Sequence, residues 1–131
     1  MNKVIAVIGS RNFPSKKRVF DVLNELYLAS YQYSDFHDRA LLVTGGARGP
    51  DTWAEEWAKS IGMRVEVIRP INSVNPKNFL YRNIEILCKA DEVVAFWDGK
   101  SSGTIFTVNY AHARKMKVHL IKDERRISKL D

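Results

Sequence analysis

The sequence lacks the features of disulfide-stabilised, secreted and membrane-spanning proteins. Its 131 residues include one cysteine, Cys88, so no disulfide can form within the chain. No apolar run reaches the roughly 18 residues needed to cross a bilayer, and the chain enters a predicted strand without a signal sequence. We therefore expect a cytoplasmic protein with no membrane partner.

Metal-ligating side chains are also scarce. The three histidines, His37, His112 and His119, lie far apart in the sequence. They form no metal-ligand spacing with Cys88 or with the carboxylates. We expect no bound metal and no cofactor.

Basic residues, by contrast, are abundant. Lysine and arginine number 21 against 15 acidic residues, which gives a formal net charge of +6. Clustered basic residues can bind nucleic-acid phosphates, but here residues 16–18 begin a predicted helix and acidic residues interrupt the basic group at 122–129. This distribution favours a solvated surface over a nucleic-acid interface. Basic charge is equally suited to a small anionic ligand.

The length and composition fit one domain that spans residues 1–131, because a chain of this size with 45% hydrophobic residues can bury one core. Short apolar runs rich in branched residues predict five buried strands, at 3–8, 40–44, 64–68, 92–96 and 117–121. Helical spacing between them predicts four helices, at 15 to about 31, 50–61, 76–89 and 103 to about 115. This alternation predicts an α/β fold, a Rossmann-like doubly wound parallel sheet with helices on both faces.

Apolar residues recur on one face of the first three helices, as expected for helices that cover a sheet. The stripes are Val19, Val22, Leu23 and Leu26; Ala54, Trp57, Ala58 and Ile61; and Leu80, Ile84, Leu87 and Cys88. They make Trp57 a core residue and Cys88 a small buried hydrophobe. Trp97, at the end of the fourth strand, either packs in the fold or stacks on a bound base.

Three turns rich in glycine or hydroxyl groups follow the first, second and fourth predicted strands. In a Rossmann-like order the first strand lies between the other two, so these turns meet at the carboxyl edge of the sheet. They comprise residues 9–11, 44–51 and 98–104. A strand that passes through such a turn into a helix leaves backbone N–H groups free to hold an anion. The turns therefore predict a phosphate pocket.

The turn at 98–104 gives the strongest of these signals. Ser101, Ser102 and Thr104 offer three hydroxyl groups at a helix start whose dipole favours an anion, whereas one helix cap needs only one hydroxyl. Arg11 either places a guanidinium group over the same crevice or forms a surface ion pair.

Gly45 and Gly46 either allow a ligand to approach the backbone closely or serve only a tight connection. Their pattern departs from both the dinucleotide fingerprint and the Walker loop. Neither of those families is indicated.

Four segments, in this order, resemble the SLOG superfamily, which is named for the Smf/DprA and LOG proteins. They are Val-Ile-Gly-Ser-Arg-Asn-Phe at 7–13, Thr-Gly-Gly-Ala-Arg-Gly-Pro-Asp at 44–51, Tyr-Arg-Asn at 81–83, and Ala-Phe-Trp-Asp-Gly-Lys-Ser-Ser-Gly-Thr at 95–104. The chain is most similar to the small single-domain branch related to YspA, which is also seen in phage and bacterial conflict contexts. The resemblance spans nearly the whole chain.

The resemblance implies a domain that binds a nucleotide or a nucleotide-derived phosphate ligand, and it suggests a homodimer. The family's motif positions fall on Gly9, Ser10, Arg11, Gly45, Gly46, Asp51, Arg82, Asn83, Ser101, Gly103 and Thr104. Helical spacing alone would leave Arg82 exposed and Asn83 at the border of the apolar stripe. The resemblance instead implies that this pair reaches a ligand phosphate.

Two other functions stay open. The LOG branch resembles a phosphoribohydrolase that cleaves the base from a nucleoside monophosphate, and it carries an acidic residue shortly after its Gly-Thr pair. Here residues 105–107, Ile-Phe-Thr, follow that pair, so Asp51 and Asp98 are the candidate carboxylates for such chemistry. Resemblance to the Smf/DprA branch implies single-stranded DNA binding as the third function.

Overall fold

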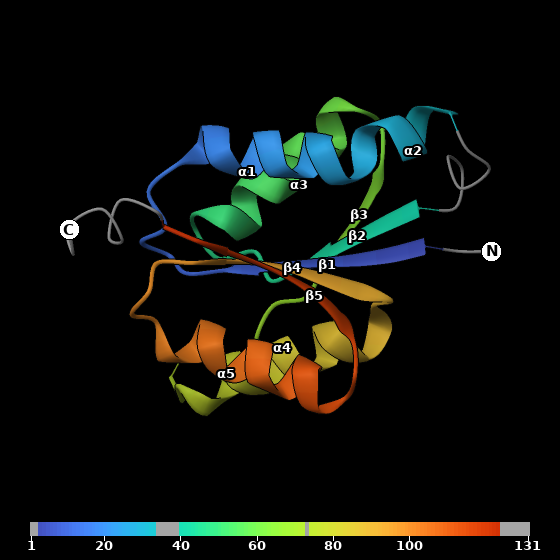
Figure 1. Cartoon of the computed structure of the whole chain (residues 1–131). Coiled ribbons are helices and arrows are strands. Elements are labelled where there is room, and N and C mark those ends of the chain that lie inside the picture. Colours follow the sequence, from blue (N-terminus) through green and yellow to red (C-terminus); the bar gives the residue numbers. More distant parts are fainter. Residues whose placement is uncertain (1–2, 34–39, 73, 124–131) are drawn as a thin grey trace.

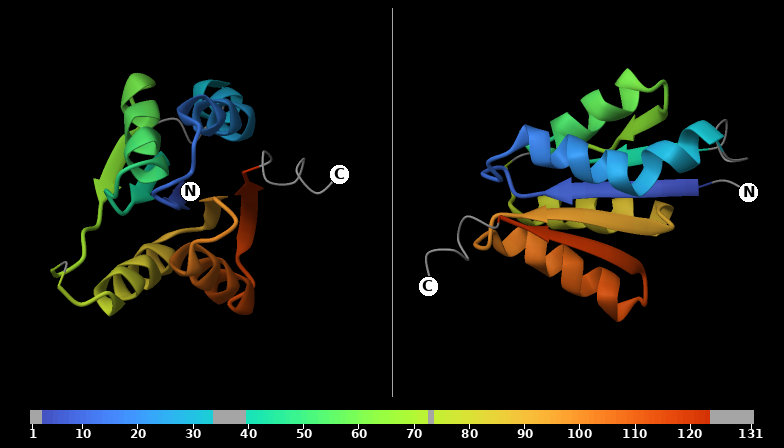
Figure 2. Two further views of the ribbon diagram at one scale, coloured as in Figure 1. Left: turned by 90° about the vertical axis from the view of Figure 1, so that its left-hand side faces the viewer. Right: turned by 45° about the horizontal axis from the view of Figure 1, so that its top comes forward.

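The structure is a computed structural model, which describes residues 3–33, 40–72 and 74–123. Its centre is a five-stranded, all-parallel sheet with the strand order β3-β2-β1-β4-β5, shown in Figures 1 and 2. The strands are β1 (Lys3–Gly9), β2 (Ala40–Thr44), β3 (Arg64–Val67), β4 (Glu92–Trp97) and β5 (Lys117–Lys122). The predicted Rossmann-like fold is confirmed, and every strand ends within one residue of its predicted bounds.

Helices cover both faces of the sheet (Figure 1). On one face lie α1 (Lys16–Leu23), α2 (Ala29–Tyr33) and α3 (Pro50–Ser60), and on the other lie α4 (Lys77–Lys89) and α5 (Ser102–Ala113). The first predicted helix contains a π-helical segment, η1 (Asn24–Leu28), between α1 and α2. Apolar spacing does not reveal this segment.

The central strands are buried on both sides, as their continuous apolar runs predict. On β1, Ile5 and Val7 pack against the α1–α3 layer, whereas Ala6 and Ile8 pack toward α4 and α5. This burial fixes β1 and its following turn at the middle of the sheet.

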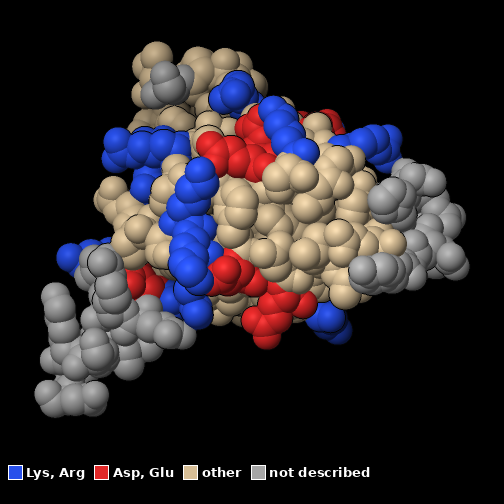
Figure 3. Space-filling view, turned by 90° about the horizontal axis from the view of Figure 1, so that it is seen from above, with Lys and Arg blue, Asp and Glu red and all other residues tan. Residues whose placement is uncertain are grey.

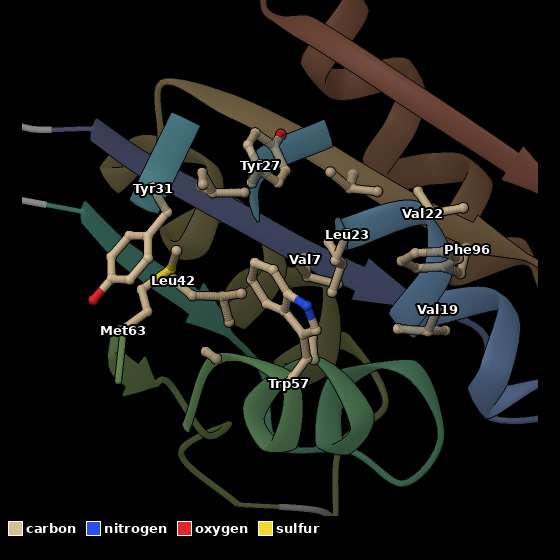
Figure 4. Close-up of a cluster of buried hydrophobic side chains, with 14 of the residues drawn as sticks. Val7, Val19, Val22, Leu23, Tyr27, Tyr31, Leu42, Trp57, Met63 and Phe96 are labelled. Carbon is tan, nitrogen blue, oxygen red and sulfur yellow. The ribbon is translucent and has the colours of Figure 1, made fainter. Parts of the chain in front are cut away.

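Trp57 of α3 is fully buried in the first of these two cores (Figure 4). Its indole N–H donates to Asn24 Oδ1 at 2.8 Å, so the polar atom is satisfied. The predicted core role of Trp57 is confirmed.

The predicted buried face of α4 is confirmed only in part: Leu87 is buried, but Leu80 and Ile84 are half-buried. Its buried residues are Arg82, Ile86 and Leu87, whereas Cys88 is exposed and not a buried hydrophobe. Residues 82 and 86 share a face because they are four positions apart. The buried face of α4 therefore includes an arginine, which a search for apolar spacing does not count.

A buried acidic residue, Glu92, lies at the amino end of β4. It forms an ion pair with Lys3, and it accepts hydrogen bonds from Tyr27 Oη at 2.6 Å and His119 Nε2 at 3.1 Å. Burial alone would raise the pKa of Glu92, but these partners outweigh it and lower the pKa to about 2. The cluster joins β1, β4, β5 and η1 at the edge of the sheet opposite the predicted pocket.

Candidate functional site

A cleft of about 560 Å³ opens at the carboxyl edge of the sheet, where the turns after β1 and β4 meet. These turns lie on the left in Figure 1, the side that faces the viewer in the left panel of Figure 2. The cleft brings together eleven of the predicted residues: Gly9, Ser10, Arg11, Asp51, Arg82, Asn83, Asp98, Ser101, Ser102, Gly103 and Thr104. Gly45 and Gly46 do not line it and lie in an adjoining groove.

Hydroxyl groups connect the turns after β1 and β4. The oxygens Ser10 Oγ and Thr104 Oγ1 are 3.1 Å apart and share a hydrogen bond, and Ser10 Oγ also accepts the N–H of Asp98 at 3.2 Å. Ser101 Oγ caps α5 by accepting the N–H of Thr104 at 3.4 Å. These three hydroxyl groups therefore hold the rim of the cleft in place.

The N-terminus of α5 leaves two donors facing this rim. Asp98 Oδ1 accepts the N–H groups of Lys100 and Ser101, each at 2.8 Å, which makes Asp98 part of the turn itself. In the described part of the chain, no group accepts a hydrogen bond from the backbone N–H of Ser102 or Gly103. The first turn of a helix offers such free N–H groups to an anion.

Arg82 forms the floor between the turns. It is 7% exposed, and its guanidinium group donates to the carbonyl oxygen of Gly45 and to Asn83 Oδ1. A Cβ atom on Gly45 would lie 2.5 Å from Arg82 Nη1. Glycine at position 45 thus admits the buried arginine.

Asn83 connects Arg82 to α5. Its amide donates to Thr107 Oγ1 at 3.0 Å, and that hydroxyl donates to the carbonyl oxygen of Gly103 at 2.9 Å. The predicted Arg-Asn pair therefore lies at the cleft as one hydrogen-bonded unit.

Phe79 is a cleft residue that the sequence analysis missed. Arg11 lies 5.0 Å and Arg82 5.7 Å from the centre of its ring, within the range of a cation–π contact. The ring thus contacts both the exposed Arg11 and the buried Arg82, which line the cleft. Its location, three residues before Arg82 on the same helix, is the signal that could have identified it.

Asp51, at the start of α3, supplies a buried carboxylate. It is 4% exposed; Oδ2 accepts the N–H of Ala47 at 3.3 Å, whereas no described residue forms a hydrogen bond with Oδ1. Burial raises the pKa of Asp51 to about 6, although Arg82, the N–H groups of Ala47 and Gly45, and Arg11 act in the opposite direction. The cleft therefore holds a carboxyl group that titrates near neutral pH.

The model of the YspA, cpYpsA-related SLOG family (YAcAr) matches residues 3–72, a segment that includes the turns at 9–11 and 44–51. The chain belongs to this SLOG family. No curated protein matches the sequence significantly.

Three solved structures are similar to this SLOG chain in fold. DNA processing protein A (DprA) from Streptococcus pneumoniae has a TM-score of 0.71 and 17% identity over 91% of this chain. TM1055 has a TM-score of 0.64 and 23% identity over 88%. DprA from Helicobacter pylori, described for its single-stranded DNA binding mode, has a TM-score of 0.63 and 20% identity over 90%. The chain spans 50%, 72% and 64% of these proteins, respectively.

A second groove of about 600 Å³ adjoins the cleft of this SLOG protein and shares Arg11 and Arg82 with it. It is lined by the turn after β2, with Gly45 and Gly46, and by Arg69, Pro70 and Asn72 after β3. Gly46 has a φ of 74°, which favours glycine, and its carbonyl oxygen accepts Arg69 Nη1–H at 3.4 Å.

Trp97 does not line either hollow. Its indole N–H donates to the carbonyl oxygen of Ser101 at 3.0 Å, and Lys122 lies 5.4 Å from the centre of its ring. Packing in the fold is thus the role that its contacts support.

Two absences hold for residues 3–33, 40–72 and 74–123. No group of three or more histidine, cysteine or carboxylate side chains there could hold a metal ion; His37 lies outside those residues. None of their helices is long and apolar enough to span a membrane.

Proposed function

We propose that this SLOG protein binds a nucleotide or nucleotide-derived ligand, with a phosphate between the turns at Gly9 and Ser101. The observation that carries the proposal is the composition of one cleft: a helix N-terminus, two guanidinium groups held by an aromatic ring, and a buried carboxylate. A nucleoside phosphate offers a complementary group for each of them, namely an anion and sugar hydroxyls.

The anion-binding part consists of the α5 N-terminus and Arg11. The N–H groups of Ser102 and Gly103 supply two donors, and the helix dipole adds favourable potential within the first turn. Arg11 is exposed and lines the cleft, so its planar fork is available to phosphate oxygens. Arg82 contributes positive charge from below.

Asp51 would bind the sugar. A buried carboxylate oxygen without a partner costs free energy that a donor can recover. Asp51 Oδ1 is itself buried, so a ribose hydroxyl group can donate to it once the carboxylate turns toward the cleft, and this contact satisfies the oxygen. The raised pKa of about 6 leaves the group ionised, and hence an acceptor, at pH 7.5.

The test is thermal unfolding with nucleoside mono-, di- and triphosphates, cyclic nucleotides and ADP-ribose. A ligand at about one hundred times its Kd adds roughly 2.7 kcal/mol, which raises Tm by several degrees. Arg11→Gln should remove most of the shift. Arg64→Gln, an exposed arginine at the opposite end of β3, is the matched control and should keep it.

Gly103→Ala separates ligand access from folding. A Cβ at this position meets only Leu80 Cδ2, at 3.9 Å, so the helix accepts alanine and gains about 0.5–1 kcal/mol. The same methyl group crowds a phosphate on the α5 N-terminus, so we expect weaker binding in a variant at least as stable as the wild type. Undiminished binding would remove the α5 N-terminus from the proposed site.

A second candidate function is N-glycosidic hydrolysis of a nucleoside monophosphate, and Asp51 favours it. A buried carboxyl with a pKa of about 6 suits general acid–base catalysis near neutral pH. Release of free base from the four 5′-mononucleotides, followed by chromatography, tests this activity. Asp51→Asn should abolish release; no release at high protein concentration would refute hydrolysis and leave the binding proposal intact.

A further inference from the structure

The groove beside the cleft contains more positive charge than one phosphate requires. Arg48 and Arg69 line this groove but not the first cleft, whereas Arg11 and Arg82 line both. Arg11, Arg48 and Arg69 are all exposed. Four guanidinium groups therefore surround two connected hollows.

These arginines differ from a group of surface lysines that pair with acidic residues. On the α1–α3 layer, lysines pair with acidic residues, as in Lys16–Glu56 at 2.7 Å and Lys59–Glu55 at 2.7 Å, and Figure 3 shows both charge signs side by side on this face. Within the described ranges, neither Arg48 nor Arg69 forms an ion pair with a carboxylate. The excess charge of the groove is thus not neutralised by those parts of the chain.

The arginines also act on one another. Burial lowers the pKa of Arg82, Asp51 raises it, and the charges of Arg11 and Arg69 lower it further. This repulsion is relieved when an anion enters between the groups. A charged cluster of this kind is typical of a binding site and unfavourable for folding alone.

The sheet gives the spacing of the two hollows. The first lies over the ends of β1 and β4, and the second over the ends of β2 and β3. Their centres are therefore two strand steps apart, about 10 Å at roughly 4.8 Å per step. The two phosphates of a pyrophosphate share one oxygen atom and are much closer together than these centres. The phosphates of adjacent nucleotides lie six bonds apart, which takes the second phosphate past the shared Arg11 and Arg82 into the near side of the groove.

We propose that the groove is a second anion subsite, and that the ligand carries two phosphates separated by a nucleoside, as in a 5′-phosphorylated dinucleotide. This inference rests on the proposed function of the first cleft. The 5′-phosphate binds at the α5 N-terminus, the first nucleoside passes Arg11 and Phe79, and the internucleotide phosphate meets Arg48 and Arg69.

The test compares affinities by isothermal titration calorimetry. The probes are the four 5′-mononucleotides, the four 5′-phosphorylated homodinucleotides, ADP-ribose and a thymidine dodecamer. If Arg48 and Arg69 each form a charge-assisted contact with the internucleotide phosphate, we expect the best dinucleotide to bind roughly ten- to a hundredfold more tightly than its mononucleotide. The double variant Arg48→Gln/Arg69→Gln should remove this advantage, and Arg64→Gln should preserve it.

The outcomes separate the two proposals. A mononucleotide that binds as tightly as its dinucleotide overturns the second subsite and leaves the first cleft supported. If ADP-ribose binds more tightly than every dinucleotide, the second subsite is also overturned, because the ligand then carries two directly linked phosphates. If the dodecamer binds most tightly and its affinity falls steeply with salt, the second subsite is overturned and the groove is a nucleic-acid interface. If none of the probes binds, the proposed function itself is overturned.

Discussion

Replacing Asp51 with asparagine should make the protein more stable above pH 6. The carboxyl group is buried at the start of α3, and its pKa in the fold is about 6, against 3.8 for the exposed group. It therefore ionises less readily in the folded protein than in the unfolded chain, which disfavours folding once the pH is high enough for ionisation. Asparagine has no charge to desolvate, and its side-chain oxygen can still accept the Ala47 N–H.

The magnitude follows from the two pKa values. Below pH 3.8 the carboxyl is neutral in both states, so its burial carries no charge penalty. The penalty grows between pH 3.8 and 6, because only the unfolded chain ionises fully there, and it is complete above pH 6. Each pKa unit is worth about 1.4 kcal/mol, so the total is about 3 kcal/mol, or about 10 °C in Tm for a chain of this length.

The assay is thermal unfolding of the wild type and of Asp51→Asn at pH 4, 5, 6, 7 and 8. We expect the advantage of the variant to be small at pH 4, to rise up to pH 6 and to stay constant above it. Asp21→Asn is the control, because Asp21 pairs with Lys17 on the exposed surface of α1 and contributes under 1 kcal/mol. An advantage that is equal at pH 4 and pH 8, or a variant less stable than the wild type at pH 8, would refute the reasoning.

Three further predictions concern other parts of the molecule. Glu92→Gln should lower the free energy of unfolding by about 3 kcal/mol at pH 7 and by less than half of that at pH 3, measured by urea titration. The depressed pKa of Glu92 stabilises the fold above pH 4.5, and this stabilisation fades toward pH 2. An equal loss at both pH values would contradict the assigned ion pair. Gly45→Ala should destabilise the protein by about 1–3 kcal/mol, measured in the same way, because a Cβ displaces the buried Arg82 guanidinium from its carbonyl partner; unchanged stability would show that Arg82 relaxes freely. Cys88 should react with a thiol reagent in the folded protein as fast as in denaturant, since it is exposed on α4. Slower reaction in the folded protein would show that Cys88 is buried and would contradict its exposed position.

The sheet was predictable because its strands are buried on both faces. Runs such as residues 4–8 and 93–97 have no polar face, which is typical of a parallel sheet between two helix layers. Strict alternation with helices then leaves few topologies, and the observed order follows the Rossmann-like one. The π-helical segment at 24–28 escaped prediction because it leaves the apolar spacing of the helix almost unchanged.

The candidate site was predictable in its turns and less so in its floor. Glycine and hydroxyl residues after β1 and β4 mark the rim, and the topology brings those two turns together. The position of Arg82 depends on a hydrogen bond to Gly45, 37 residues earlier, and no periodic pattern records such a contact. The same arginine explains why the buried face of α4 was predicted only in part, since the helix buries a charged residue that apolar spacing does not include.

Arg82 and Asp51 together carry a free-energy cost that supports the proposed binding role of this edge of the sheet. Both groups are buried, yet burial shifts each pKa toward the neutral form, so the fold bears their charges at a cost. Glu92, at the opposite edge, is equally buried but has three partners and a pKa lowered to about 2. Glu92 thus has its buried charge satisfied, whereas Asp51, a residue that lines the cleft, has one buried carboxylate oxygen without a hydrogen-bond partner among the described residues. Departures of this kind are expected at sites selected for a ligand, and a ligand that meets both groups should stabilise the protein in proportion to its affinity.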